Sequence, residues 1–310
     1  MASPLRLAGG VYDHSGLPEA HGAMEVVRSC NVCQSNHLQM VDAQYNLCRC
    51  EECGYVFDSP RPTAVEVARF YSKPAKYDLW LKEEKARDAL WRRRLTNLLL
   101  HKAEGNLLDV GAGIGQFLHH ARPYFTEVTG IEVSESAVRI AREKYGIDLL
   151  AGQIEELDIA PGSFDNITLF HVLEHVPDPR RLIHLCCDLL RPRGILAIAV
   201  PNDVLAWTSW VKKLGRRLGL RAFQKFSPVL GIARAGESRE IHLSHFTPAV
   251  LHKVLKDSGF AIVEESLDPY YAAGGMRFIL DGIYYRLHQI IYSTMKANYY
   301  DTIWMIVRKP

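Results

Sequence analysis

Three glycines alternate with other residues in the segment 111–115, directly after the apolar run 107–110. Glycine lets the backbone turn sharply, and it lets a ligand approach without a Cβ in the way. Such a turn at the carboxyl end of a buried strand is where open α/β sheets bind ligands. Glu132 ends the next apolar run, 21 residues after Gly111, and a carboxylate there suits the two hydroxyls of a ribose. These residues predict a site for a ligand that contains a ribose.

Four cysteines form a second group with a regular spacing. Cys30 pairs with Cys33 and Cys50 pairs with Cys53, each as Cys-x2-Cys, and sixteen residues separate the two pairs. This is the spacing of a zinc ribbon, in which two knuckles supply four thiolates to one tetrahedral ion. A closed set of four ligands leaves no position for water, so the predicted Zn2+ is structural. An iron–sulfur cluster or four unrelated buried thiols stay as alternatives.

The elements that position the glycine loop follow from the hydrophobic pattern. Short apolar runs alternate with helix-like segments, which is typical of a parallel sheet covered on both faces. We expect strands at 106–110, 127–131, 165–170, 194–200, 260–264 and 302–307. We expect helices at 78–100, 114–121, 136–145, 178–190, 248–258 and 283–295. The predicted fold class is therefore α/β.

The glycine spacing distinguishes between two cofactors that use such a loop. A dinucleotide-binding loop has a glycine or alanine three residues after its second glycine. That position is Gln116 here, and the third glycine comes one residue early, at Gly115. The order Asp109-x-Gly-x-Gly-x-Gly instead resembles the class I S-adenosylmethionine-dependent methyltransferases. The resemblance extends through Gly194 toward Pro310, and it implies an enzyme with a Rossmann-like, seven-stranded methyltransferase sheet.

The resemblance also implies which residues bind S-adenosylmethionine. Asp109 and the backbone of the glycine loop would line the methionyl end, and Glu132 would bind the ribose hydroxyls. Gln153 stands where the family often has an aspartate that reaches the adenine amine, and its amide oxygen can still accept that hydrogen bond. The implied cofactor-binding set is Asp109, Gly111, Ala112, Gly113, Gly115, Glu132, Val133, Gln153, Ile154, Phe170 and His171.

The histidines supply the candidate base. Methyl transfer from a sulfonium is an in-line displacement, for which the protein aligns the nucleophile and removes its proton. A histidine titrates near neutral pH and is a natural general base. Of the 13 histidines, we expect His175 or His245 to be catalytic, because both follow strands whose ends face the cofactor. His242 is a third candidate, and alignment without a base also stays open.

The cysteine pairs are part of a wider resemblance. The segment from Cys50 to Thr63 resembles the zinc ribbon of a methyltransferase subgroup that acts on sugars or secondary metabolites. We therefore expect a disordered lead-in over residues 1–25, a zinc ribbon over 26–62 and a class I methyltransferase domain over 63–310. This domain is expected to carry a basic insert at 203–240 and a tyrosine-rich helical insert at 268–300.

The two inserts leave several roles open. The basic insert has eight Lys or Arg against three Asp or Glu. It is either a solvated lid or a cap that closes over an anionic acceptor. The tyrosine-rich insert is interpreted as core, as the interface of a homodimer or as a wall of an apolar substrate site.

Composition excludes several classes of protein. Lys and Arg number 37 and Asp and Glu 35, so the net charge of +2 gives no general reason to bind nucleic acid. No uncharged apolar run reaches the roughly 18 residues of a membrane span. The first ten residues lack the pattern of a secretory signal. We therefore expect a cytoplasmic protein without a transmembrane segment.

Three functions remain at this point. The leading one is methyl transfer to an oxygen or carbon of a small-molecule acceptor, which is a sugar, a lipid-linked compound or a secondary metabolite. An RNA methyltransferase that holds RNA with its ribbon is disfavoured by the acidic residues of 26–60. A non-catalytic S-adenosylmethionine-binding module is disfavoured by the intact glycine loop and Glu132.

Overall fold

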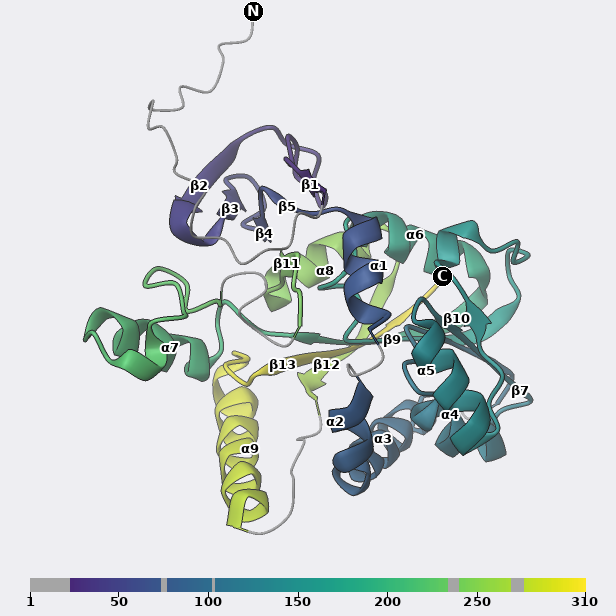
Figure 1. Cartoon of the computed structure of the whole chain (residues 1–310). Coiled ribbons are helices and arrows are strands. Elements are labelled where there is room, and N and C mark those ends of the chain that lie inside the picture. Colours follow the sequence, from purple (N-terminus) through teal and green to yellow (C-terminus); the bar gives the residue numbers. More distant parts are fainter. Residues whose placement is uncertain (1–22, 74–76, 102–103, 234–239, 269–275) are drawn as a thin grey trace, which may run out of the picture.

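The computed structural model describes residues 23–73, 77–101, 104–233, 240–268 and 276–310. A seven-stranded sheet with the strand order β12-β13-β10-β9-β6-β7-β8 forms its centre (Figure 1). The strands are β6 (Asn106–Val110), β7 (Glu127–Glu132), β8 (Leu150–Ala151), β9 (Phe164–Phe170), β10 (Leu190–Pro201), β12 (Ala261–Leu267) and β13 (Thr302–Arg308). The five strands from β8 to β10 are parallel, and β13 is antiparallel to both of its neighbours. The predicted Rossmann-like methyltransferase fold is confirmed.

Helices cover both faces of this sheet. They are α1 (Ala64–Tyr71), α2 (Asp78–Lys82), α3 (Glu84–Leu99), α4 (Gln116–Ala121), α5 (Glu135–Ile140), α6 (Pro179–Leu189), α7 (Trp207–Arg217), α8 (Pro248–Asp257) and α9 (Met276–Met295). Asp178 caps α6, because its side chain accepts a hydrogen bond from the backbone N–H of Arg181. In contrast to the others, α7 and α9 project away from the sheet (Figure 1).

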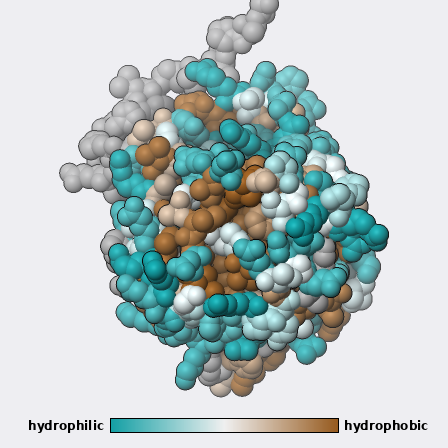
Figure 2. All heavy atoms as spheres, turned by 90° about the vertical axis from the view of Figure 1, so that its right-hand side faces the viewer, coloured by the Kyte–Doolittle hydropathy of each residue, from teal (hydrophilic) through white to brown (hydrophobic). Residues whose placement is uncertain are grey.

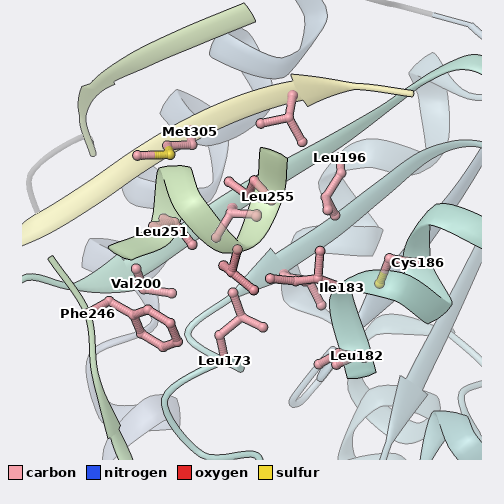
Figure 3. Close-up of a cluster of buried hydrophobic side chains, with 14 of the residues drawn as sticks. Leu173, Leu182, Ile183, Cys186, Leu196, Val200, Phe246, Leu251, Leu255 and Met305 are labelled. Carbon is pink, nitrogen blue, oxygen red and sulfur yellow. The ribbon is translucent and has the colours of Figure 1, made fainter. Parts of the chain in front are cut away.

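Both faces of the central sheet are buried, which explains why its strands are continuous apolar runs in the sequence. In β10, Leu196, Ile198 and Val200 belong to one buried cluster, and the alternate residues Ile195 and Ala197 belong to another. The first cluster includes side chains of α6 and α8, which pack on the same face of the sheet (Figure 3). The second includes side chains of α3 and α4. Successive side chains of a strand point to opposite faces, so a sheet that is covered on both sides buries all of them.

The helix boundaries differ from the sequence prediction in several places, and α9 begins at Met276, seven residues before the predicted helix at 283–295. The predicted helix at 78–100 is interrupted at Glu83, which separates α2 from α3. The helix predicted at 114–121 begins at Gln116, because Gly115 has a φ of +74° and precedes it as the N-cap. The helix predicted at 136–145 ends its regular part at Ile140 and continues as a π-helical turn. The short strand β8 was not predicted.

A second, four-stranded sheet lies beside the first. It has the order β11-β4-β3-β2 and consists of β2 (Leu38–Asp42), β3 (Leu47–Cys50), β4 (Val56–Asp58) and β11 (Ser244–His245). The first three strands come from the cysteine-rich segment, whereas β11 comes from a segment nearly two hundred residues later. The sheet therefore joins the N-terminal segment to the chain that follows the basic insert.

Most of the predicted lead-in, residues 1–22, lies outside the described residues. Its last residues differ from the prediction, because β1 (Met24–Glu25) pairs with β5 (Arg61–Pro62). The side of the molecule that bears α4, α5 and α6 carries hydrophobic side chains near its middle, surrounded by hydrophilic ones (Figure 2). Within the described residues, no helix combines the length and the apolar character that a membrane crossing needs.

Candidate functional site

A cavity of about 460 Å³ opens beside the glycine loop. Its walls come from α1, α2 and α3, from the loops that follow β6 and β7, and from the segment that follows β9. Since these loops follow parallel strands, they meet at the carboxyl edge of the sheet. The volume lies within the 300–1,000 Å³ that is usual for a small-molecule site.

Two glycines shape the loop side of the cavity. Gly111 and Gly113 have φ angles of +74° and +55°, which side chains with a Cβ rarely adopt. A Cβ on Gly111 would lie 2.6 Å from Val172 Cγ2, and one on Gly113 would lie 2.7 Å from a ring carbon of Trp80. Either contact is too short for real atoms. Glycine is therefore required at both positions, because of the positive φ angles and because Val172 and Trp80 lie so close.

The side chain of Glu132 is hydrogen-bonded to the glycine loop. Its Oε2 accepts a hydrogen bond from the Gly113 backbone N–H at 2.8 Å, and its Oε1 accepts one from Ser134 at 2.9 Å. Burial raises the pKa of this carboxyl above its ordinary value. The side chain lines the cavity together with Val133, Gln153 and Ile154, which the resemblance also assigns to cofactor binding.

Three residues of the predicted cofactor set lie behind the cavity wall. Asp109, Ala112 and Gly115 are not among the residues that line it. Asp109 accepts a hydrogen bond from Thr168 Oγ1 at 2.6 Å, and burial raises its pKa to about 7. These positions therefore support the loop from the sheet side.

The far wall contains a buried polar group that the sequence analysis missed. Arg94 of α3 forms an ion pair with Asp268, with Nη2 at 2.6 Å from Oδ2, and donates from Nη2 to Nε2 of His171 at 2.9 Å. The remaining nitrogen, Nη1, is buried without a hydrogen-bond partner. The available signal was that Arg94 interrupts the apolar face of the predicted helix at 78–100, between Trp91 and Leu95.

His175 is the predicted base that lies in the cavity wall. Its Nδ1–H donates to the carbonyl oxygen of Ile241 at 2.6 Å, and Tyr71 Oη lies 3.0 Å from the same nitrogen. Nε2 is then the nitrogen that can accept a proton, and Glu174 Oε1 lies 3.8 Å from it. Burial lowers the pKa of His175, so its ring is neutral at pH 7.

The structure places His245 outside this cavity. It is buried between two carboxylates, with Nε2 at 3.1 Å from Asp58 Oδ1 and Nδ1 at 3.1 Å from Asp203 Oδ2. Burial alone would lower its pKa, but the hydrogen bonds to these carboxylates raise it to about 9. Both nitrogens then carry a proton and neither can accept one. This geometry favours His175 over His245 as the base.

His242 lies between these two histidines. Its Nδ1 is 3.1 Å from the same Asp203 oxygen, and its ring centroid is 5.1 Å from that of His175. Burial would lower the pKa of His242, but the neighbouring carboxylate of Asp203 raises it well above the usual range. His242, Asp203 and His245 therefore form a line of hydrogen-bonded side chains that runs from beside His175 toward the four-stranded sheet.

The four cysteines of the predicted zinc ribbon meet at one point. The sulfur atoms of Cys30, Cys33, Cys50 and Cys53 all lie within 4.8 Å of one another. The Cys30–Cys53 and Cys33–Cys50 sulfur distances are both 3.5 Å. Four thiolates at 2.3 Å from a tetrahedral zinc ion would lie about 3.8 Å apart, so the donor set and its size fit that ion. Cys48 is outside this group, with its sulfur 3.9 Å from Met40 Sδ.

Sequence comparison agrees with the fold and with the cavity at the glycine loop. The sequence model of the family described as "Methyltransferase domain" matches residues 83–265. Because this match covers more than half of the chain, the chain belongs to that family. The family and the strand order together make it a class I S-adenosylmethionine-dependent methyltransferase.

Individual relatives share moderate sequence identity with parts of this chain. The ubiquinone biosynthesis O-methyltransferase of Xanthomonas euvesicatoria pv. vesicatoria is 35% identical over 109 residues, which cover 33% of this chain and 46% of that protein. A protein of the same name from Idiomarina loihiensis is 29% identical over 185 residues, which cover 53% of this chain and 72% of that protein. The chain thus spans about half the length of the first relative.

Solved structures show a similar fold. One chain of the complex between the Haloferax volcanii Trm112 methyltransferase activator and a methyltransferase superposes with a TM-score of 0.51 at 14% identity. The superposition covers 77% of this chain and 98% of that chain. At this identity the likeness concerns the fold alone.

Proposed function

We propose that this protein transfers a methyl group from S-adenosylmethionine to an oxygen of a small-molecule acceptor, and that His175 removes the acceptor's proton. One observation carries the proposal: the same cavity is lined by Gly113 and Glu132 on one side and by His175 on the other. The O-methyltransferase names of the relatives support oxygen over carbon. A sugar, a lipid-linked compound and a secondary metabolite stay as acceptor classes.

The cavity offers suitable partners for each part of the cofactor. The Glu132 carboxylate suits the ribose hydroxyls, while Val133, Gln153 and Ile154 suit the adenine. The Nη1 of Arg94 lacks a hydrogen-bond partner in the same cavity wall, so it suits the methionyl carboxylate. When bound, S-adenosylmethionine supplies a methyl carbon that is activated by its sulfonium.

His175 has the geometry of a general base. Its Nδ1–H donates to the Ile241 carbonyl, so Nε2 is the atom that would take the proton of the acceptor hydroxyl when its oxygen displaces S-adenosylhomocysteine from the methyl carbon. The imidazolium that results lies beside the buried Glu174 carboxylate. Burial acts to raise the pKa of Glu174, but the nearby His175 and His171 lower it, so this side chain is negative when the proton arrives.

The zinc ribbon is proposed to hold one Zn2+ through Cys30, Cys33, Cys50 and Cys53 and to position the base. Strand β4 of the ribbon pairs with β11, and the Asp58 backbone N–H donates to the Leu243 carbonyl at 3.0 Å. On its other side the same segment donates from Leu243 N to the Glu174 carbonyl at 2.7 Å. Residues 241–245 therefore lie between the ribbon and the loop that carries His175, and a correctly folded ribbon fixes that loop.

The test uses S-adenosylmethionine with an isotopically labelled methyl group and a panel of phenols, sugars and prenylated phenols as acceptors. A general base contributes about 10²–10⁴-fold, so His175→Ala should lower turnover by that factor while S-adenosylhomocysteine binds as in the parent. Because the pKa of His175 is lowered by burial, activity of the parent should fall only below pH 6.5, as the ring becomes protonated.

His184→Ala is the matched control, because His184 lies on α6 and does not line the cavity. Parental turnover in His175→Ala would show that alignment suffices without this base. If S-adenosylhomocysteine does not bind to the parent in calorimetry, the proposed function itself is wrong.

A further inference from the structure

Helix α7 has its apolar side chains on the outside. Trp207, Trp210, Val211, Leu214 and Leu218 recur at spacings of three and four, which places them on one helical face. All five are exposed, with Trp207 at 53% and Leu218 at 66%. A stripe with this spacing ordinarily packs against a core, but here it faces solvent.

The buried residues of α7 lie outside this apolar stripe. They are the small Ser209 and Gly215. A Cβ on Gly215 would lie 2.6 Å from the ring of Phe223, so the chain after the helix packs closely against Gly215. The protein thus turns small residues inward and two tryptophans outward, with their rings stacked at 5.0 Å between centroids. The outward apolar face is therefore built into the fold.

The charged residues of the segment that contains this stripe are all basic, although Asp301 from outside the segment bonds to Thr208 of α7. The sequence from Val204 to Ala233 contains six Lys or Arg and no Asp or Glu. Among the described residues, no carboxylate forms an ion pair with any of the six, which are Lys212, Lys213, Arg216, Arg217, Arg221 and Lys225. A partner that covers this face must supply both apolar contacts and negative charge.

Helix α9 adds a second exposed apolar stripe at the same end of the molecule. Ile279, Ile283, Leu287 and Ile290 lie on successive turns and are all exposed. The chain after α9 holds the start of α7, because the Trp207 backbone N–H donates to the Tyr299 carbonyl at 2.9 Å. Both helices project from the body of the molecule on the side away from α4 and α5 (Figure 1).

We propose that α7, supported by α9, docks this protein on the surface of an anionic lipid bilayer. Tryptophan and leucine side chains would enter the boundary between headgroups and acyl chains, and the Lys and Arg side chains would contact lipid phosphates. A second copy fits less well, since a two-fold interface would set six cations against six cations. An RNA would meet the charges but leaves the aliphatic part of the stripe unused.

This surface goes beyond the proposed methyl transfer and does not depend on it. It lies on the chain that follows β10, whose neighbour β9 leads into the loop of His175, so docking would bring the carboxyl edge of the sheet near the lipid. An acceptor held in a membrane would then reach the cavity without crossing water.

The test is co-sedimentation of the full chain with vesicles of phosphatidylcholine alone or with 30% phosphatidylglycerol. The parent should bind the anionic vesicles and bind weakly to the neutral ones. Each basic residue near an anionic surface contributes about 1 kcal/mol, so Arg217→Glu/Arg221→Glu should weaken binding more than tenfold. Trp207→Ala/Trp210→Ala should weaken it similarly, and this loss should persist at high salt.

Matched controls lie elsewhere on the surface. Arg28→Glu/Arg92→Glu makes the same change in net charge, and Val65→Ala/Leu100→Ala removes two other exposed apolar side chains. Both should bind like the parent, and circular dichroism checks the fold of each variant. The proposal is overturned if the parent does not bind anionic vesicles or if the α7 variants bind as it does. It is also overturned if those variants lose only self-association, or only binding to an RNA oligonucleotide.

Discussion

The two sides of the cavity are built in different ways. The side with the glycine loop comes from neighbouring parts of the chain: Gly113, Glu132 and Gln153 follow successive strands, and Glu132 holds Gly113 through a direct hydrogen bond. The side with His175 is assembled from distant parts, because Tyr71, Ile241 and the ribbon all contribute to the position of that ring. We infer that damage to one side leaves the other nearly intact.

The polar groups of the two sides of the cavity also have different hydrogen-bond partners. Glu132 bonds to backbone N–H groups, which belong to the loop itself. His242 and His245 are instead hydrogen-bonded to the carboxylates of Asp203 and Asp58, which come from other elements, and His175 is hydrogen-bonded to the Ile241 carbonyl. The first side is fixed by local turns, whereas the second depends on ion pairs that form only when three segments meet.

Removal of the metal that we propose for the ribbon is expected to affect the side of the cavity with His175. Cys50→Ser should lose the zinc that we expect at about one ion per chain, because one of four thiolates is removed. Turnover should then fall more than tenfold, since residues 241–245 lose their support, while S-adenosylhomocysteine still binds within about threefold of the parent. Elemental analysis and calorimetry measure the two results.

Cys48→Ser is the control for this change, because Cys48 is buried in the same ribbon but lies outside the four-sulfur group. It should keep both the metal and the turnover. Zinc retained in Cys50→Ser, or lost in Cys48→Ser alone, would contradict the ligand assignment. Equal losses of cofactor affinity and turnover would contradict the independence of the two sides.

A substitution in the glycine loop should affect the cofactor side of the cavity. Gly113→Val should weaken binding of S-adenosylhomocysteine about 100-fold, because its Cβ would meet the Trp80 ring in the cavity and the φ of +55° disfavours a branched side chain. Gly162→Val is the matched control, since this glycine also has a positive φ but nothing lies within 4 Å of its Cβ position. Calorimetry measures both, and zinc content should not change in either. Parental affinity in Gly113→Val would place the cofactor elsewhere.

A further expected effect concerns the pH dependence of stability and His245. Its pKa is raised from 6.5 to about 9 in the folded protein. This interaction therefore stabilises the fold fully below pH 6.5, and the contribution is lost as pH rises through about 9. The loss is of order 3 kcal/mol in the free energy of unfolding, which urea unfolding at pH 6, 7.5 and 9 measures.

His245→Gln should remove most of this pH dependence. His252→Gln is the control, because it removes a histidine–carboxylate pair between α8 and β12, with Nε2 at 2.6 Å from Glu265 Oε2, without touching the ribbon. An unchanged pH dependence in His245→Gln would show that His245 does not join the ribbon to the sheet through its charge.

The sequence by itself determined the features that depend on nearby residues. The alternation of apolar runs and helices predicted the fold, since strands buried on both faces are continuously apolar. The positions of Gly111, Gly113 and Glu132 predicted one side of the cavity, because a strand, a tight turn and the next strand are always close in a parallel sheet. The spacing of the two Cys-x2-Cys pairs similarly predicted that the four sulfur atoms lie close together.

Only the tertiary structure decided which histidine faces the cavity. His175 and His245 are equally good bases by residue type, but the fold buries His245 between Asp58 and Asp203 and leaves His175 in the wall. Arg94 is a similar case, since its buried pairing with Asp268 joins residues 174 positions apart. Side chains from distant segments acquire their protonation and exposure from the surroundings that packing gives them, and no local pattern encodes those surroundings.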